Sequence, residues 1–476
     1  MKIRYGLVLA AALGLGLTGC ASGGGGGGGG GGVAGMIAEA SGDEGVPPRE
    51  TENTDQAREL IESAEDAGSP AAAAPLYSQA LAAAEAEIAA SPDNPLGHRL
   101  AAIASLGLEN YQEAGAFFDR AGELYPLYEF QDAGMREQTW IDLYNQAMPL
   151  IGEAEYETAA VYLDDANAIF ASRPEAFITA GQIYAQLRQH DKALDNLTAA
   201  EEIIAGASEE DLDAETLAAW REQGDVIPLL RAQILSDAGR FEEASAVFAE
   251  ILAENPGDTQ MAMNLAATQM QTGDEAGAME IYGRLLNDPS VGPTDLYRIG
   301  IGFYQGRDYE RASEAFGQAA EANRMDRDAL EMWTRSLQID SVYTAVPDVA
   351  ERWIELDPNS QNALLIYAQS ANQIGDSQLA GELVQRIEAL EVTVDELQMR
   401  RYPSGGAQVT GTVSNQALSA GTSATLTFTF YSIDGAQLGT VDHTISVGEQ
   451  GMSELFQIEF DSTQQVGGYG YTLSVG

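Results

Sequence analysis

The chain has 476 residues and a formal net charge of −49, with 73 acidic side chains against 24 basic ones. A surface of this sign repels the phosphate backbone of nucleic acids and anionic lipid headgroups, so the composition excludes both as direct partners of the folded body. The single cysteine excludes internal disulfide bonds and metal sites built from several thiolates.

The first twenty residues have the pattern of an export signal. Lys2 and Arg4 form a charged start, and Leu7–Leu17 is an apolar core that is too short to span a bilayer. The core ends in Leu17-Thr18-Gly19-Cys20, which resembles the lipobox of bacterial lipoproteins. An ordinary signal peptide with an incidental cysteine is the alternative.

The resemblance to a lipobox carries several expectations. It implies that residues 1–19 are a signal peptide cleaved before Cys20, and that Cys20 then carries acyl chains, palmitate among them, in the membrane. Several acyl chains give stable anchoring, where a single one gives only marginal binding. Because Ala21 rather than aspartate follows the cysteine, the resemblance further implies attachment to the outer membrane, facing the periplasm.

Residues 20–54 are predicted to form a flexible tether behind the lipidated cysteine. Gly23–Gly32 is an unbroken run of glycine, and Pro47-Pro48 lies in the mixed-charge stretch that follows. No strand pattern precedes the glycine run and no Lys-Ser or Lys-Thr pair follows it, so it does not match a phosphate-binding loop. A flexible chain of this size has a root-mean-square reach of roughly 30 Å.

A period of 34 residues dominates the rest of the chain. Small or apolar residues recur at this interval, at Ala244, Ala278, Ala312, Val346 and Ala380. Within Asp295–Ala322, one helical stripe is followed by Gly306-Arg307-Asp308 and then by a second stripe that contains Phe316. This pattern resembles the tetratricopeptide repeat (TPR), a helix–turn–helix unit that buries its apolar stripe by stacking on its neighbours in a solenoid.

We predict about nine such repeats in residues 55–400, in blocks at about 55–128, 138–206 and 225–393. The interval between small residues lengthens to 45 between Ala114 and Ala159, and to 51 between Ala193 and Ala244. The second break is expected to hold an extra helix near Glu209–Gln223. A helical array without true TPR geometry is the alternative. The predicted fold class is therefore mainly α.

Residues 405–476 are predicted to form a small antiparallel β-sandwich of about five strands. Apolar and polar residues alternate there, for example around Ile458. The run Phe428-Thr429-Phe430-Tyr431-Ser432 resembles the motif of FxLYD-type modules in exported proteins, although Phe430 replaces the motif's leucine and Ser432 its aspartate. An unrelated immunoglobulin-like sandwich is the alternative.

No pattern in the sequence predicts catalysis, a metal site or a cofactor. The only histidines are His98, His190 and His443, and neither a His-x-x-x-His nor a Gly-x-Ser-x-Gly motif occurs. Acidic pairs such as Asp164-Asp165 are expected by chance in so acidic a chain. We therefore predict that the protein is not an enzyme. The alternative, an enzyme that uses clustered carboxylates, would need two acids that face one pocket.

The TPR resemblance also predicts which residues face a partner. In TPR arrays the second, fifth, ninth and twelfth positions of each repeat line the concave face. Carried onto this chain, these positions are poor in charge and rich in Met, Tyr and Gln, which suit adaptable apolar contact. The candidate partner-binding residues among them are Gln233, Met263, Met270, Tyr297, Tyr304, Arg335 and Gln369. The alternative is that these side chains pack inside a tightly wound solenoid.

Together these features predict an outer-membrane TPR lipoprotein. Its expected function is that of a lipid-anchored periplasmic scaffold or adaptor, which mediates protein–protein interactions in an envelope assembly or export system. The expected partners are other envelope proteins on the concave face and the membrane through the acyl chains on Cys20. A lipoprotein that binds envelope polysaccharide or peptidoglycan is the alternative.

Overall fold

The computed structural model describes residues 45–209 and 212–476. The chain divides after Arg240 into two compact units, which we call the N-terminal unit and the C-terminal unit. The signal peptide, Cys20 and the glycine-rich run lie outside the described residues, so the predictions of lipidation and of a tether over residues 20–44 remain predictions. Residues 45–54 of the predicted tether are described, and the first helix begins among them, at Glu52. Within the described residues, no helix combines the length and the apolar character needed to cross a bilayer.

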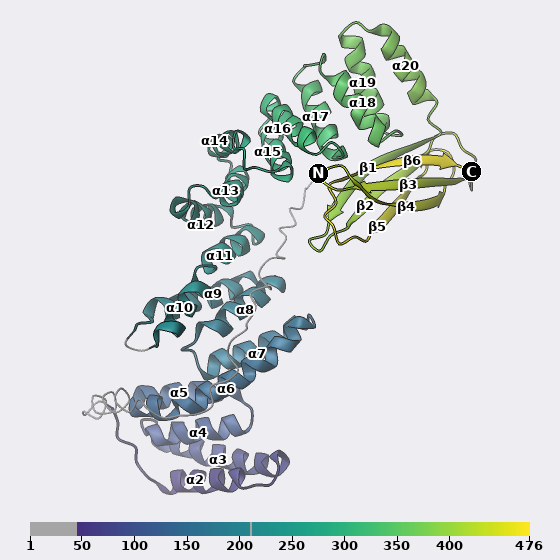
Figure 1. Cartoon of the computed structure of the whole chain (residues 1–476). Coiled ribbons are helices and arrows are strands. Elements are labelled where there is room, and N and C mark those ends of the chain that lie inside the picture. Colours follow the sequence, from purple (N-terminus) through teal and green to yellow (C-terminus); the bar gives the residue numbers. More distant parts are fainter. Residues whose placement is uncertain (1–44, 210–211) are drawn as a thin grey trace. The chain divides into compact units, whose positions relative to one another are not determined.

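The N-terminal unit is built from helical hairpins (Figure 1). Its helices are α2 (Glu52–Glu65), α3 (Pro70–Ala90), α4 (Pro95–Gly107), α5 (Tyr111–Leu124), α6 (Leu127–Gly152), α7 (Tyr156–Ile169), α8 (Pro174–Gln186), α9 (His190–Gly206), α10 (Ala214–Gly224) and α11 (Ile227–Asp237). The long helix α6 runs through the first break in the repeat period. The second break contains α10, where the sequence predicted an extra helix.

The C-terminal unit continues the hairpins and ends in a β domain. Its helices are α12 (Phe241–Glu254), α13 (Thr259–Thr272), α14 (Glu275–Leu286), α15 (Pro293–Gln305), α16 (Tyr309–Ala322), α17 (Arg327–Ile339), α18 (Val346–Leu356), α19 (Gln361–Gln373) and α20 (Ser377–Glu388). The strands are β1 (Val392–Arg401), β2 (Ala407–Asn415), β3 (Ser423–Tyr431), β4 (Gln437–Ser446), β5 (Ser453–Phe460) and β6 (Gly468–Val475). This arrangement confirms the predicted fold class.

Eight of the turns inside hairpins use one residue in the left-handed backbone region, and the turn between α2 and α3 is the exception. These residues lie five positions before the small residue of each repeat: Glu109, Ala154, Arg188, Gly239, Gly273, Arg307, Ser341 and Gly375. The following amide closes the helix by donating back to it, as Asp308 N does to Phe303 O at 2.9 Å. Asp308 then caps the next helix by accepting from Arg311 N at 3.1 Å.

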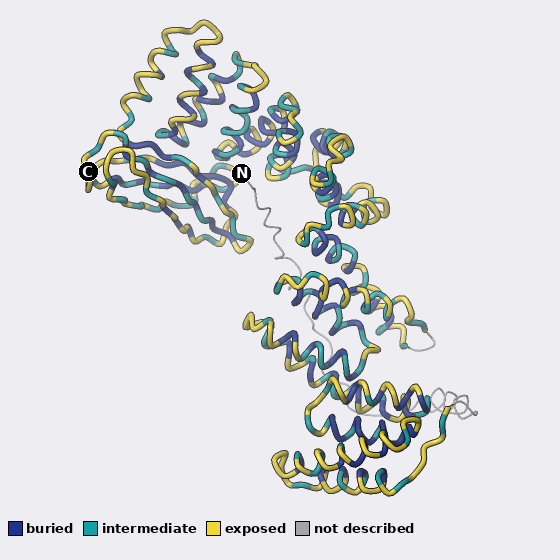
Figure 2. The backbone as a smooth tube through the Cα atoms, turned by 180° about the vertical axis from the view of Figure 1, so that it is seen from behind, coloured by how far each residue is buried: buried dark blue, intermediate teal, exposed yellow. Residues whose placement is uncertain are grey.

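The core follows the contact lines between hairpins. The small residue of each repeat is fully buried from Ala80 to Val346. Gly300 permits one of the close approaches between paired helices, because a Cβ there would lie 2.6 Å from the ring of Phe316. Figure 2 shows buried backbone where helices face each other and mostly exposed backbone along α20, in which only Leu383 is buried. The last hairpin is thus covered on one side only.

The β domain consists of two three-stranded antiparallel sheets, β1-β2-β5 and β4-β3-β6. Phe430 of one sheet stacks on Phe460 of the other, with 4.4 Å between ring centroids. The domain begins at β1, which lies inside the segment that the sequence analysis assigned to helices. A bulge between Asp395 and Gln398 interrupts the alternation in β1, and this interruption hides the strand from a search for period two.

The β domain is joined to the last hairpins by buried polar side chains. Arg327, at the start of α17, donates from Nε and Nη2 to Asp357 Oδ2 at 3.0 and 2.8 Å. Asp357 closes α18, and its Oδ1 accepts a 2.7 Å hydrogen bond from the Tyr471 hydroxyl in β6. All three side chains are buried. Removing one partner of such a pair leaves an uncompensated charge away from water.

The backbone of β6 lies directly against the turn before α17. Asn323 donates from Nδ2 to the carbonyl oxygen of Gly467 at 2.8 Å, and Arg401 of β1 donates to the same oxygen at 2.7 Å. A Cβ on Gly468 would lie 1.8 Å from the carbonyl oxygen of Met325, so this approach requires glycine. The β domain and the last hairpins therefore form one packed junction.

Asp326 is a further titratable group at this junction. It caps α17 by accepting from Ala329 N at 3.0 Å, and Arg401 Nη2 lies 3.5 Å from its Oδ2. Burial raises the pKa of Asp326 to about 6; the neighbouring Asp328 adds to the rise, and Arg401 opposes it. A raised pKa in the folded state means that the protonated form stabilises the junction. That contribution is complete below about pH 4 and is lost as the pH rises through 6.

We expect Asp326→Asn to stabilise the C-terminal unit at pH 7.5 by about 1–3 kcal/mol, because the amide keeps the capping oxygen and does not ionise. The gain should shrink as the pH falls below 6, because the folded protein then protonates Asp326, and it should vanish below the ordinary aspartate pKa of 3.8. Hydrogen exchange of α17 and β6 in a pH series measures the effect. Asp340→Asn, at an exposed acid just after the same helix, is the matched control. A gain that does not vary with pH would contradict the assignment.

Candidate functional site

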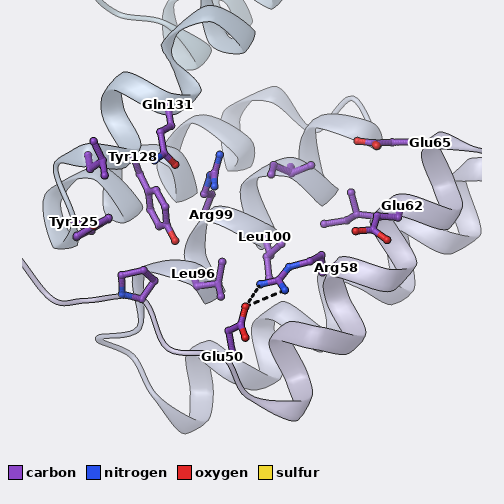
Figure 3. Close-up of a pocket in the computed structure, with 14 residues that line it drawn as sticks. Glu50, Arg58, Glu62, Glu65, Leu96, Arg99, Leu100, Tyr125, Tyr128 and Gln131 are labelled. Carbon is purple, nitrogen blue, oxygen red and sulfur yellow. Dashed lines mark hydrogen bonds and ion pairs between the residues drawn. The ribbon is translucent and has the colours of Figure 1, made fainter. Parts of the chain in front are cut away.

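A hollow of about 650 Å³ lies in the N-terminal unit (Figure 3). Its walls are the first helices of three successive hairpins, α2, α4 and α6. The floor is apolar and includes Ile61, Leu96 and Leu100, all buried. Tyr125 and Tyr128 stand on the α6 side, with 5.1 Å between ring centroids in an edge-to-face arrangement. The hollow is therefore an apolar groove with a polar rim. We call it the α2–α4–α6 hollow.

Two arginines in the hollow are held by carboxylates. Arg99 donates from Nε at 2.9 Å and from Nη2 at 2.7 Å to Asp132, whose side chain is 3% exposed. The same guanidinium lies 4.6 Å from the ring centroid of Tyr128. Arg58 donates to Glu50 at 3.1 Å. Both positive charges are thus compensated inside the site.

The extended segment 46–51, which we call the strap, binds at the mouth of the hollow. The Arg49 amide donates to Asn94 Oδ1 at 3.0 Å, and Asn94 Nδ2 donates back to the Arg49 carbonyl at 2.9 Å. Val46 N donates to Leu124 O at 2.7 Å. Asn94 is fully buried, and it hydrogen-bonds the backbone of the strap rather than its side chains. This geometry is how an amide side chain holds an extended peptide.

Glu87 completes the strap's anchorage. It accepts from the Thr51 hydroxyl at 2.6 Å and from Asn94 Nδ2 at 2.8 Å. Burial acts to raise the pKa of Glu87, but hydrogen bonds from Asn94 and Thr51 outweigh it, and the net effect lowers the pKa. The carboxylate therefore stays ionised and keeps Asn94 in the orientation that the strap requires.

The sequence-predicted partner-binding residues lie mainly in the C-terminal unit, and their exposure differs. Met263 of α13 is 6% exposed and belongs to the core, against which Met270, Tyr297 and Tyr304 pack while half-buried. Arg335 of α17 is half-buried and Gln369 of α19 is exposed. Gln233 of α11 is half-buried and lies in the N-terminal unit. Part of the predicted set therefore serves the core of the solenoid.

The more accessible members of the set form a strip along α15, α17 and α19. Tyr304 meets Tyr309 edge to face, with 5.3 Å between centroids. Burial raises the pKa of Tyr304, and the charge of Arg335 opposes this rise. Gln338 Nε2 donates to Gln369 Oε1 at 2.7 Å. We call Tyr304, Arg335, Gln338 and Gln369 the C-terminal strip.

The residues of the α2–α4–α6 hollow were missed by the sequence analysis, although the signal was present. Leu96, Arg99 and Ile103 lie 18, 15 and 11 positions before Ala114. Met263 lies at the same distance before Ala278 as Arg99 does before Ala114. Applying the concave-face positions to the first block would have identified this wall. The strap had no comparable signal, because it precedes the first repeat.

Neither the α2–α4–α6 hollow nor the C-terminal strip has the ligands of a metal centre. Within residues 45–209 and 212–476, no three side chains of His, Cys, Asp or Glu come together in a way that would hold a metal ion.

Comparisons with known proteins found similar solved structures and matching family models. No curated protein matches the chain. Among solved structures, the C-terminal part of a TPR protein from Cytophaga hutchinsonii is 14% identical and covers 52% of this chain and 95% of that chain, with a TM-score of 0.41. MamA MSR-1 is 20% identical (35% and 95% covered, TM-score 0.30). YrrB, described as a TPR protein with an unusual peptide-binding site, is 16% identical (38% and 93% covered, TM-score 0.32).

Two stretches of the chain match family models described as tetratricopeptide repeat, residues 58–129 and residues 235–289. The first stretch contains the α2–α4–α6 hollow up to the beginning of α6. The second runs from the end of α11 through α14. The chain therefore contains tetratricopeptide repeats, and the hollow is built from them.

The difference in burial between Met263 and Gln369 predicts different effects on stability. We expect Met263→Ala to lower the free energy of unfolding of the C-terminal unit by about 2–4 kcal/mol, because it leaves a cavity in the core. Gln369→Ala should change it by less than about 0.5 kcal/mol. Urea denaturation followed by hydrogen exchange of α13 and α19 measures both. Equal effects of the two substitutions would contradict the burial described above.

Proposed function

We propose that the protein is a lipid-anchored periplasmic scaffold whose TPR hairpins bind segments of other envelope proteins. The α2–α4–α6 hollow is the observation that carries this proposal. Three first helices supply a concave apolar floor, and the Arg99–Asp132 pair fixes its side wall before any ligand arrives. A preformed groove of this kind spares a peptide ligand part of the cost of ordering its receptor.

A peptide fits the hollow better than a sugar does. Sugar rings bind on the open faces of aromatic side chains. Tyr128 is only 6% exposed, and Arg99 already lies over its ring. By contrast, Asn94 holds the backbone of the strap with two hydrogen bonds, which is a mode of recognition suited to peptides. We therefore prefer a protein partner to the polysaccharide alternative.

The anchoring part of the proposal is supported by the sequence at the N-terminus. The lipobox-like run Leu17-Thr18-Gly19-Cys20 and the following Ala21 favour acylation and the outer membrane. The strongly acidic composition is consistent with a body that does not adhere to anionic lipid. The role we propose is binding, and it requires no reactive group.

A photo-crosslinking amino acid at Gln131, an exposed residue that lines the hollow, should capture a partner protein in intact cells. The same amino acid at Glu85, exposed on the second helix α3, is the matched control. We expect discrete adducts from position 131 and none from position 85, identified by mass spectrometry. Absence of adducts at 131, or the same adducts at both positions, would count against a scaffold that works through this groove.

Acylation is tested by metabolic labelling with an alkyne-bearing palmitate analogue. We expect the label on the native chain to fall to background in Cys20→Ser, because the thiol is the only attachment point for the lipid that precedes cleavage. Ser22→Ala, two residues away, should keep the label. Persistence of the label in Cys20→Ser would disprove lipidation at this residue and leave the groove proposal untouched.

A further inference from the structure

We propose that the α2–α4–α6 hollow selects a partner segment that carries basic side chains beside apolar ones. This inference rests on the proposed function and adds the chemistry of the ligand to it. Three observations carry it: the charges left over in the hollow, the apolar floor, and the use that the chain makes of its own strap.

The compensated pairs leave the hollow with an excess of negative charge. Glu50 neutralises Arg58 at 3.1 Å, and Asp132 neutralises Arg99 at 2.7 Å. Glu62 and Glu65 then remain on the α2 wall; both are exposed, and neither pairs with a cationic side chain in the described part of the chain. A lysine or arginine of a partner would meet two free carboxylates there. An acidic segment would meet repulsion.

The apolar floor favours a ligand that has apolar side chains in addition to basic ones. Ile61, Leu96 and Leu100 are buried under the hollow and Ile103 is half-buried, so the groove presents side-chain carbon between its acidic wall and its tyrosines. Covering this carbon with apolar side chains of a ligand is favourable, because it removes apolar surface from water. A ligand that combines Leu or Ile with Lys or Arg therefore uses both surfaces, whereas a purely basic one uses only the acidic wall.

The strap explains why the hollow is acidic rather than neutral. It brings Glu50 to Arg58 and thereby consumes the positive charge on the α2 wall that would otherwise attract an acidic ligand. Residues 21–44 do not complement the remaining carboxylates, because they contain no lysine or arginine. A second copy of so acidic a chain is also a poor match. The occupant that fits is a basic and apolar segment of a different protein.

The test uses the purified full-length protein and a short fluorescent peptide in which lysine and leucine alternate. We expect binding at physiological salt, with hydrogen-exchange protection in α2 and α4. Glu62→Gln with Glu65→Gln should weaken this binding about fivefold. The control is Glu85→Gln with Glu113→Gln, which removes the same charge from exposed positions on the second helices α3 and α5 and should change binding less than about twofold.

Two further peptides separate the contribution of apolar contact to binding from that of charge. Replacing leucine by serine should abolish the protection of α4, and replacing lysine by glutamate should abolish binding. Equal weakening by the two double variants would show general attraction to an acidic protein and would overturn the proposal, as would binding of the glutamate peptide. If the crosslinker at position 131 captures a partner but the Glu62→Gln, Glu65→Gln variant binds the lysine–leucine peptide normally, the charge preference is wrong and the scaffold function stands. If Gln131 captures nothing, the function itself fails.

Discussion

The close approach of helices at one small residue per repeat is the constraint on which this structure depends. Ala114, Ala278 and Ala312 are completely buried at equivalent places in their hairpins. A larger side chain there would push the paired helices apart and expose the aromatic residues that fill the surrounding space, such as Phe316. Because each hairpin buries its apolar stripe against the neighbouring hairpin, this displacement of the helices would be transmitted along the array. The spacing of first helices, and hence the shape of the hollow, follows from this contact.

The left-handed turn residue recurs at the same interval as the small buried residue. This regularity explains which turns the sequence made predictable and which it did not. The turns at Gly239, Gly273 and Gly375 contain glycine, which adopts the left-handed region freely. Arg307 and Ser341 adopt the left-handed region at the equivalent position of their own turns, although a residue with a side chain rarely does so. A search for glycine therefore finds only some of the turns, whereas the 34-residue period finds all of them in the late block. The helices and the inserted α10 were predictable for this reason.

Tertiary contacts account for the parts that were not predicted. The concave-face rule placed Met263 and Tyr297 on a surface, but the packing of neighbouring hairpins draws Met263 into the core and places Tyr297 edge-on against Phe316, with 5.4 Å between centroids. Strand β1 was hidden by its bulge. The buried contact of Arg327 with Asp357 joins residues 30 positions apart, and the bond from Tyr471 spans 114. No local pattern encodes such a junction.

At both ends of the described chain, buried polar side chains hold extended backbone against helical hairpins. At one end, β1 and β6 are edge strands of their sheets, and the bonds of Asn359 to Val392 O and to Tyr471 hold them against the last hairpins. These bonds cover the beginning of one edge strand and hold a side chain of the other, and uncovered strand edges are open to pairing with other chains. At the other end, Asn94 holds the strap against the first hairpins. Because the strap follows the segment that leads from Cys20, the rim of the hollow is where the chain from the proposed anchor joins the folded body. A partner bound in the hollow would then lie beside that attachment point.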